Sequence, residues 1–206
     1  KKYATHLLAR AHPPKYIVAV NENFQGKEIV ELIKGTNINL LFILNDLTEE
    51  EKLLSGRPRT QTPNWLGSIT PDAEAGGYEM AKAIINASNQ KYGTTKHLFA
   101  LSGDDTTPSS IARNNGLLRA LKPYKKSINL HLESVNWSQK TAYKVTRRFL
   151  KHSSNLGVKA FWGGNDDISI GIMHALDATG RSGGADYFIA GLNWSAPALK
   201  LVKNGK

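Results

Sequence analysis

The chain lacks cysteine altogether, which excludes disulfide bonds, thiolate metal sites and cysteine nucleophiles. It also lacks long hydrophobic runs: the longest, such as residues 40–44, have the length of a strand, well short of the ~18–20 residues that span a bilayer. No signal peptide is visible, because Lys1 opens directly into a sequence typical of a helix interior. We therefore expect a globular chain that is a mature or trimmed form of a longer protein.

Acidic residues are in short supply: 17 Asp and Glu stand against 27 Lys and Arg, which gives a net charge of +10. An excess of this size is typical of nucleic-acid-binding proteins. Here, however, no run of five basic residues and no aromatic-interleaved RNA motif appears. The basic residues are scattered along predicted helices, for example at Lys122, Lys125, Lys126, Lys140, Lys144, Arg147, Arg148 and Lys151. We therefore favour a solvated basic surface and expect no nucleic-acid partner.

Short apolar segments alternate with amphipathic ones along almost the whole chain. This alternation predicts an α/β fold, in which a parallel sheet is covered by helices on both faces and the crossovers are right-handed. The expected strands are residues 16–20, 38–44, 65–69, 97–101, 128–133, 158–162 and 187–191. The expected helices are residues 1–11, 26–34, 72–90, 109–121, 138–152, 166–179 and 196–203. Residues 46–67 are the least periodic, and most of them are interpreted as a polar surface excursion.

The length of 206 residues suits one large domain or two lobes of about 100 residues each. About three of the expected strands precede residue 93, and about four follow residue 96. The polar stretch 91–96 between them is a natural divider. We therefore expect two doubly wound parallel-sheet lobes, residues 1–94 and residues 95–206.

Polar side chains follow two consecutive strands of the second lobe. Asn165, Asp166 and Asp167 come after the strand 158–162, and Asn193 and Trp194 come after the strand 187–191. Ligands of open α/β sheets bind just beyond the carboxyl ends of the strands. The two loops therefore predict a cleft lined with amides, carboxylates and indoles.

Two further side chains are candidates for ligand contacts. Arg113 lies one turn into the helix 109–121, where its guanidinium either binds hydroxyls or a carboxylate in a fork or faces solvent. Asp72 follows Pro71 at a helix start, and its position alone favours capping over ligand contact. The hydroxyl-rich loop 102–110 suggests a phosphate cup, but its two carboxylates oppose an anion, so capping of the next helix by Thr107 or Ser109 is favoured.

No convincing catalytic set appears in the sequence. The six histidines lack the spacing of a metal site, and no Gly-x-Ser-x-Gly elbow, phosphate loop or dinucleotide fingerprint occurs. The carboxylate pairs 104–105 and 166–167 are adjacent in sequence, so their side chains diverge. We therefore expect no catalysis, no metal and no cofactor.

Four segments together carry a family resemblance. Residues 67–81 look like a helix of pattern Asp-x-x-x-Gly-x-x-x-Ala, and residues 110–117 look like one of pattern Arg-x-x-Gly. Residues 165–171 match Asn-Asp-x-x-Ala-x-Gly with Ser169 in place of Ala, and residues 191–194 stand where Gly-Phe/Tyr-Asp is usual. In this order and spacing, the chain resembles the type 1 periplasmic sugar-binding proteins of ABC transporters. These proteins share their two-lobed fold with the effector domains of LacI-type repressors.

The resemblance implies ligand contacts from Asp72, Arg113 and Asn165, and from the residue at position 193. Asn193 departs from the family's Asp there, so the charge-assisted bonds that a carboxylate makes to sugar hydroxyls are lost. Trp194 or Trp162 is expected to stack on a sugar ring, although a core role for Trp162 is equally compatible. The family's first strand, and its segments after Lys206, have no counterpart in this sequence, so the resemblance implies truncation at both ends.

The resemblance therefore implies a periplasmic, monomeric solute-binding protein that closes two lobes on a sugar and delivers it to an ABC permease. One alternative is the effector domain of a LacI-type regulator, which requires a helix-turn-helix upstream of Lys1. A ligand sensor feeding a signalling receptor is a second alternative. A doubly wound enzyme acting on a nucleotide or sugar phosphate is a third, and it requires a phosphate loop or a catalytic pair.

Overall fold

A computed structural model describes residues 2–153 and 156–206, which belong to two compact units. The first unit comprises the chain up to Asp72 together with Thr106–Ser109, and the second comprises Ala73–Asp105 and Ser110–Lys206. This division at Asp72 differs from the boundary at residue 94 that the sequence suggests. The reason is that the helix following Asp72 packs its buried side into the core of the second unit.

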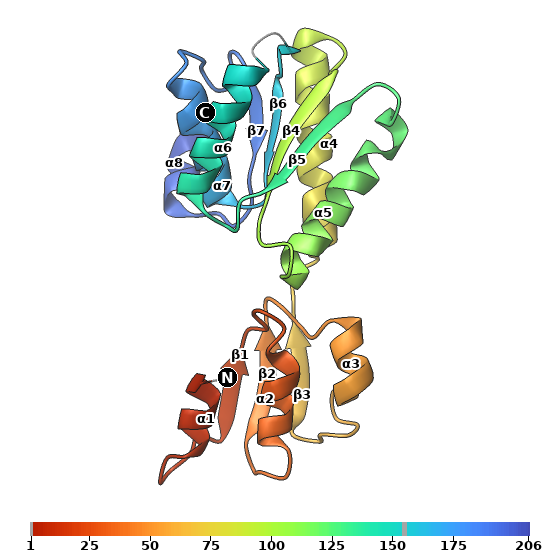
Figure 1. Ribbon diagram of the computed structural model, residues 1–206, viewed down its shortest axis with the longest axis vertical. Helices are drawn as coiled ribbons and strands as arrows, with labels where there is room; N and C mark the ends of the chain where they lie inside the picture. Colours follow the sequence, from red (N-terminus) through yellow and green to blue (C-terminus); the bar gives the residue numbers. More distant parts are fainter. Residues whose placement is uncertain (1, 154–155) are drawn as a thin grey trace. The chain divides into compact units, whose positions relative to one another are not determined.

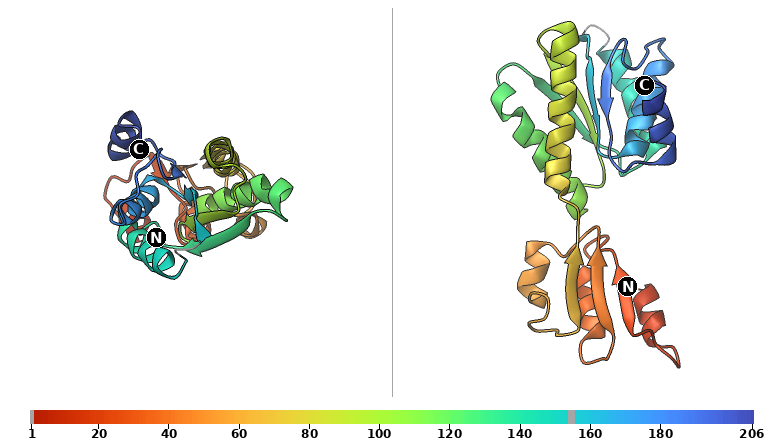
Figure 2. Two further views of the ribbon diagram at one scale, coloured as in Figure 1. Left: turned by 90° about the horizontal axis from the view of Figure 1, so that it is seen from above. Right: turned by 180° about the vertical axis from the view of Figure 1, so that it is seen from behind.

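The first unit is built on a three-stranded parallel sheet (Figure 1). Its elements are α1 (Lys2–Leu8), β1 (Tyr16–Ala19), α2 (Gly26–Ile33), β2 (Asn39–Ile43), α3 (Glu49–Ser55) and β3 (Trp65–Ile69). Because side chains alternate along a strand, Ile17, Leu40 and Phe42 point into the core beneath α2. The strands lie in front of α2 when the unit is seen from behind (Figure 2). On that open face, Tyr16 and Val18 are 66% and 59% exposed.

The second unit is built on a four-stranded parallel sheet in the order β5-β4-β6-β7. Its elements are α4 (Ala73–Tyr92), β4 (His97–Ser102), α5 (Pro108–Leu121), the 3₁₀ helix η1 (Lys122–Tyr124), β5 (Asn129–Ser134), α6 (Gln139–His152), β6 (Ala160–Gly163), α7 (Asp166–Asp177), β7 (Phe188–Ala190) and α8 (Ala196–Lys203). Among the described residues, no helix is both long and apolar enough to cross a membrane.

Two separate cores hold the helices of the second unit against its sheet. Helices α4 and α5 cover one face, where Ile85, Leu117 and Trp162 are fully buried. Helices α6 and α7 cover the other face, where Phe161 and Ile168 are fully buried (Figure 1). A parallel sheet covered on both faces is the arrangement that the sequence predicts, so the predicted fold class is confirmed.

The order of predicted strands and helices is also confirmed, with helix α3 and the 3₁₀ helix η1 as additions. Helix α3 forms within residues 46–67, which the sequence analysis interprets as a surface excursion. A capping box starts this helix: the Thr48 hydroxyl accepts from the Glu51 amide, and the Glu51 carboxylate accepts from the Thr48 amide. The pattern Thr-x-x-Glu at residues 48–51 was therefore the local signal that the periodicity analysis missed.

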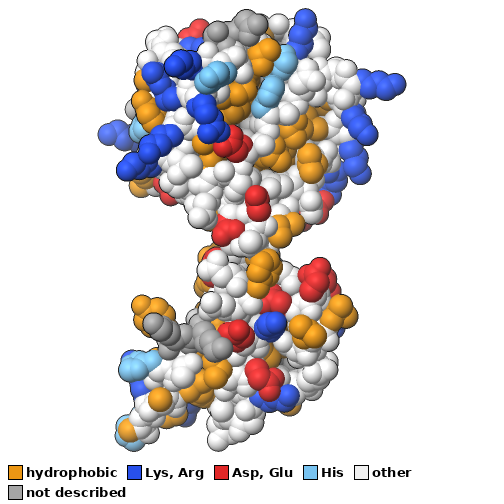
Figure 3. Space-filling view, viewed as in Figure 1, with side chains coloured by type: hydrophobic (Ala, Val, Ile, Leu, Met, Phe, Trp, Pro, Cys, Tyr) orange, Lys and Arg blue, Asp and Glu red, His pale blue; other side chains and the backbone are white. Residues whose placement is uncertain are grey.

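The two units differ in charge. Residues 1–72 carry nine Lys and Arg against eight Asp and Glu, whereas residues 73–206 carry eighteen against nine. Nearly all of the net charge of +10 therefore belongs to the second unit, whose surface bears many basic side chains (Figure 3).

Candidate ligand-binding site

Arg113 is the centre of a polar cluster at the carboxyl edge of the four-stranded sheet. It projects from α5, and only 7% of it is exposed. Its Nη1 donates a 2.6 Å hydrogen bond to the Gly164 carbonyl oxygen, and its Nη2 donates a 3.4 Å bond to Asn193 Oδ1. The structure therefore brings Arg113 and Asn193, both predicted site residues, into direct contact.

Close packing of α4 on α5 fixes the position of Arg113. A Cβ atom added at Gly77 would lie 2.1 Å from the Arg113 carbonyl oxygen, and one at Gly116 would lie 2.0 Å from the Glu74 carbonyl oxygen. Any side chain at either position would therefore push the two helices apart. Gly116 is the glycine of the Arg-x-x-Gly pattern, whereas Gly77 directly follows Gly76, the glycine of the Asp-x-x-x-Gly pattern.

Burial and charge act in opposite directions on the Arg113 guanidinium. Desolvation by burial lowers its pKa, and the nearby negative charge of Asp166 partly offsets that effect. A guanidinium remains protonated at physiological pH even so. The cluster therefore contains a fixed cation that is held by a carbonyl and an amide oxygen.

Asn165 lies beside this cluster and caps α7. Its Oδ1 accepts a 2.9 Å hydrogen bond from the Ile168 amide, and only 9% of the residue is exposed. Ligand contact by Asn165 is thus a prediction that now concerns its Nδ2 group, because the oxygen is engaged in capping. Substitution by Ala would remove the cap as well, which the sequence analysis does not anticipate.

Asp166 holds the loop that carries Asn193 and Trp194. Its backbone amide donates to the Leu192 carbonyl oxygen at 2.9 Å, and its Oδ2 accepts from the Ser195 amide at 2.7 Å. Both loop residues have positive φ, 126° at Asn193 and 57° at Trp194. Bonds at both ends of the loop therefore fix a backbone that non-glycine residues rarely adopt.

The two predicted indoles and a third one occupy different environments. Trp162 is fully buried in the core, where its Nε1 donates to the Gly77 carbonyl oxygen at 3.3 Å. Trp194 is 81% exposed. Trp137, which the sequence analysis did not select, lies with its ring 5.5 Å from the Arg113 guanidinium carbon. Of the three, Trp137 is the indole that joins the polar cluster.

Trp137 reaches this place through a tight turn after β5. Asn136 and Trp137 both have positive φ, at 50° and 60°. The Gly103 backbone lies against the indole, where an added Cβ would be 2.2 Å from the ring. The signal in the sequence was the position of Trp137 just beyond a predicted strand, at the edge where Asn165 and Asn193 were already expected.

Asp72 is the predicted site residue that lies outside the second unit. It belongs to the first unit and is exposed, whereas the other predicted site residues belong to the second unit. Its contact with a ligand remains a prediction.

The carboxyl edge of the first unit has polar residues of its own. Asn45 follows β2 and is 5% exposed; its Nδ2 donates to Glu22 Oε1 at 3.2 Å, and its buried Oδ1 has no partner among the described residues. Asn21 follows β1, and its Nδ2 donates to Glu51 Oε2 at 2.7 Å. Neither residue is among the predicted site residues. Both follow strands and were detectable by the rule that identified Asn165.

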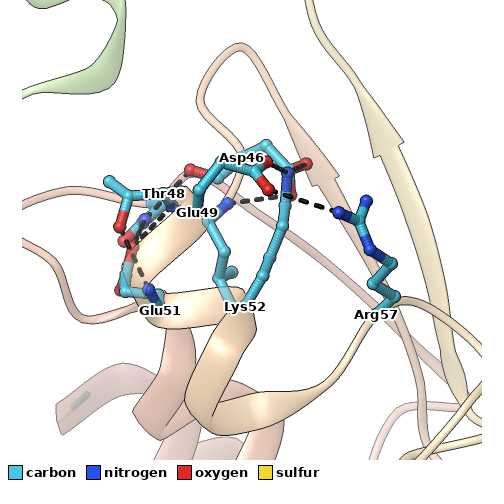
Figure 4. A network of polar contacts seen from close by, with 8 residues as sticks. Asp46, Thr48, Glu49, Glu51, Lys52 and Arg57 are labelled. Atoms are coloured by element: carbon cyan, nitrogen blue, oxygen red, sulfur yellow. Dashed lines mark hydrogen bonds and ion pairs between the residues drawn. The ribbon is translucent and has the colours of Figure 1, made fainter.

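A network of charges supports this edge (Figure 4). Lys52 Nζ lies 3.0 Å from Asp46 Oδ2 and 3.0 Å from Glu49 Oε1, and Arg57 Nη2 lies 3.4 Å from Glu49 Oε2. Burial alone would lower the pKa of Lys52, but its hydrogen bonds and charge interactions with the two carboxylates outweigh burial and raise it. The network ties α3 to the loop after β2.

A cavity of about 460 Å³ lies away from these residues, between β5 and α6. Phe99, His131, Glu133 and Phe149 are among its lining residues, and none of the predicted site residues lines it. His131 Nε2 lies 3.2 Å from His97 Nδ1, and burial together with His97 lowers the pKa of His131. The strand β5, which carries His131 and Glu133, is an edge strand of the four-stranded sheet.

No group of three or more His, Cys, Asp or Glu in the described part of the chain is arranged to hold a metal ion. The Arg113 cluster instead offers guanidinium donors, two side-chain amides and an indole face. Such groups bind hydroxyls, and a guanidinium also binds carboxylates.

The chain belongs to the periplasmic binding protein domain family, because the sequence model of that family matches residues 57–206. It is 24% identical to a xylitol-binding protein of Mycolicibacterium smegmatis over 153 residues, and this alignment covers 74% of this chain and 42% of that protein. It is 25% identical to the D-allose-binding periplasmic protein of Escherichia coli over 138 residues, and this alignment covers 67% of this chain and 42% of that protein. The matched segments thus span less than half the length of these relatives.

A solved structure agrees with this assignment. A periplasmic sugar-binding protein from Pseudomonas fluorescens superposes with a TM-score of 0.85 and 29% identity, over 100% of this chain and 58% of that chain. The resemblance and the type 1 fold expected from the sequence are thereby confirmed.

Proposed function

We propose that this protein captures a neutral sugar or polyol and delivers it to the membrane permease of an ABC transporter. One observation carries this proposal: Arg113 joins Gly164, Asn193 and Trp137 at the carboxyl edge of the four-stranded sheet. Asn165 follows Gly164 directly at the same edge. Ligands of open α/β sheets bind at such an edge.

The chemistry of the cluster suits a polyhydroxylated ligand. Each hydroxyl donates and accepts, and so does a side-chain amide such as that of Asn193. The Arg113 fork supplies donors, and the face of Trp137 suits the apolar C–H face of a sugar ring. Because Asn193 stands where the family usually has a carboxylate, we propose that hydroxyl recognition here relies mainly on neutral hydrogen bonds.

The relatives support the class of ligand. Two of them are named for xylitol and D-allose, a polyol and a neutral sugar. In the first unit, Asp72 and Asn45 are the residues that we propose as further contacts. The protein would capture its ligand by the hinge closure that periplasmic binding proteins use.

The family also supports the setting. Its relatives include a periplasmic protein and binding proteins of ABC transporters. We therefore propose a periplasmic location, a monomeric state and a permease partner for this protein. We also propose a binding rather than a catalytic role, because Asp166 is occupied by the Ser195 amide and the relatives are named as binding proteins.

A thermal-shift screen of the protein tests this proposal. The panel contains xylitol, D-allose, pentoses and inositol, with amino acids, nucleotides and sugar phosphates as the other classes. A ligand that binds only the folded state raises the free energy of unfolding by ~2.7 kcal/mol when its concentration is a hundred times Kd. The melting temperature rises as a result. We expect a shift with at least one neutral sugar or polyol. If no neutral sugar or polyol changes the melting temperature but a nucleotide or a sugar phosphate raises it, the result would instead support a regulator domain or an enzyme.

A pair of variants tests which indole stacks on the ligand. Trp137→Ala should weaken binding about tenfold, because it removes the ring beside Arg113. Trp194→Ala is the matched control, and we expect a smaller change from it because this ring is 81% exposed. The opposite ranking in calorimetry would move the stacking role to Trp194.

A further inference from the structure

Helix α6 presents a continuous basic row on the surface of the second unit. Five exposed basic residues follow one another at intervals of three or four along the helix, except that two of them are adjacent: Lys140, Lys144, Arg147, Arg148 and Lys151. Ala142, Val145 and Leu150 occupy the opposite side, where they are buried in the core. The helix contains no Asp or Glu. Its solvent face therefore carries charge of one sign (Figure 3).

Little of this charge is neutralised. Arg148 pairs with Glu133 of β5 through Oε1 at 2.6 Å. Arg147 donates to the Ala178 carbonyl oxygen at 3.3 Å, which leaves its charge uncompensated. Within residues 2–153 and 156–206, no ion pair joins Lys140, Lys144 or Lys151 to a carboxylate. Five cations thus stand against one paired carboxylate, on the unit that already holds most of the protein's positive charge.

We propose that this basic face of α6 docks the second unit on an anionic phospholipid surface. Lysine is depleted at protein–protein interfaces because its ammonium is strongly hydrated, whereas lysine rows beside anionic lipid bind without losing that hydration. Tyr143 lies within the row, 38% exposed, and its amphipathic ring suits the level of the lipid headgroups. A site for single-stranded nucleic acid would be expected to add stacking aromatics along a groove, and the row has no such series.

The contact would be electrostatic and peripheral. The apolar side of α6 is committed to the core, so the helix cannot insert into the bilayer. Binding should therefore weaken with salt, since exposed charges are screened beyond ~8 Å at physiological ionic strength. Docking of this kind would keep the protein beside a membrane whether or not a sugar is bound, so it does not depend on the proposed function.

Vesicle co-sedimentation of the full chain tests the proposal. We expect binding to vesicles of phosphatidylcholine mixed with phosphatidylglycerol, and none to vesicles of phosphatidylcholine alone. The variant K140E/K144E/K151E should bind the anionic vesicles about a hundredfold more weakly, at about fivefold per lysine removed. Circular dichroism melting of each variant verifies that it folds.

A charge-matched variant separates this face from net charge in general. K122E/K125E/K126E makes the same change in charge at exposed lysines of the second unit, in and just after η1. We expect it to keep most of the lipid binding. Equal loss in both variants, equal binding of the wild type to both kinds of vesicle, or tighter α6-dependent binding to single-stranded DNA would each overturn the proposal.

Discussion

The Arg113 guanidinium donates a 2.6 Å hydrogen bond to the Gly164 carbonyl oxygen, 51 residues further along the chain. This bond joins α5 to the end of β6, the strand that leads into Asn165. It is buried, so breaking it would leave the carbonyl oxygen without a partner. Arg113 therefore supports the geometry of the candidate site in addition to any contact that it makes with ligand.

Arg113→Lys should lower both stability and ligand affinity. Lysine keeps the charge but cannot reach both Gly164 and Asn193 as the planar fork does. We expect a loss of about 1–3 kcal/mol in urea unfolding. Arg119→Lys on the same helix is the control, because Arg119 makes a half-exposed ion pair with Glu74 and should change stability by less than about 0.5 kcal/mol. Equal effects from the two substitutions would contradict the structural role of Arg113.

Asp166→Ala should loosen the loop of residues 192–195. The Ser195 amide loses its acceptor, and the strained backbone at Asn193 and Trp194 loses one of its two anchors. We expect a stability loss of about 1–3 kcal/mol and faster hydrogen exchange at the Ser195 amide. Asp167→Ala is the matched control, since this neighbouring carboxylate is exposed. An unchanged rate of hydrogen exchange at the Ser195 amide would show that the loop keeps its conformation without the Asp166 carboxylate.

Gly171→Val should destabilise the fold without touching the site. A Cβ at this position would lie 2.4 Å from the Gln139 carbonyl oxygen of α6 and 2.9 Å from Ala142 Cβ. The neighbour that would be crowded is therefore α6. We expect a loss of about 1–3 kcal/mol or more by thermal unfolding, against a small change for the exposed His174→Val on the same helix. A normal melting temperature for Gly171→Val would refute this packing.

Tyr187 should make stability fall at high pH. Burial raises the pKa of its hydroxyl, and the charges of Asp177 and Asp186 raise it further. The folded state therefore holds this proton more tightly than the unfolded state, whose tyrosine titrates near pH 10. Its contribution is complete below about pH 10 and is lost as the pH rises above that value. Tyr187→Phe should remove this part of the pH dependence in denaturant unfolding, and identical alkaline profiles would contradict the assignment.

Much of the fold was predictable because strands and helices each bury a face of recognisable period. The buried strand around Phe161 and the amphipathic helix after Asn165 are examples. Helix α3 was missed because it buries only Glu51 and is held by capping, which apolar periodicity does not report. The division at Asp72 differs from the expected boundary because a polar stretch marks where the chain is exposed, whereas the compact unit depends on what α4 packs against.

The candidate site was only partly predictable. The sequence placed Asn165 and Asn193 at one edge, because the carboxyl ends of parallel strands share an edge. It could not show that Asn165 Oδ1 is engaged in capping, or that the ring near Arg113 belongs to Trp137 rather than Trp194. Both facts depend on backbone angles, at Asn165 and at the positive-φ turn 136–137, that residue identity does not specify.

Calorimetric titration of Asn165→Asp tests the central claim most directly. Aspartate keeps the oxygen that caps α7 but replaces the Nδ2 donor with an acceptor, so the fold should survive while a ligand hydroxyl loses its partner. With the sugar or polyol that stabilises the wild type, we predict an affinity about tenfold to a hundredfold lower, or ~1–3 kcal/mol. Unchanged affinity in a variant with a normal melting temperature would place the ligand elsewhere on the protein.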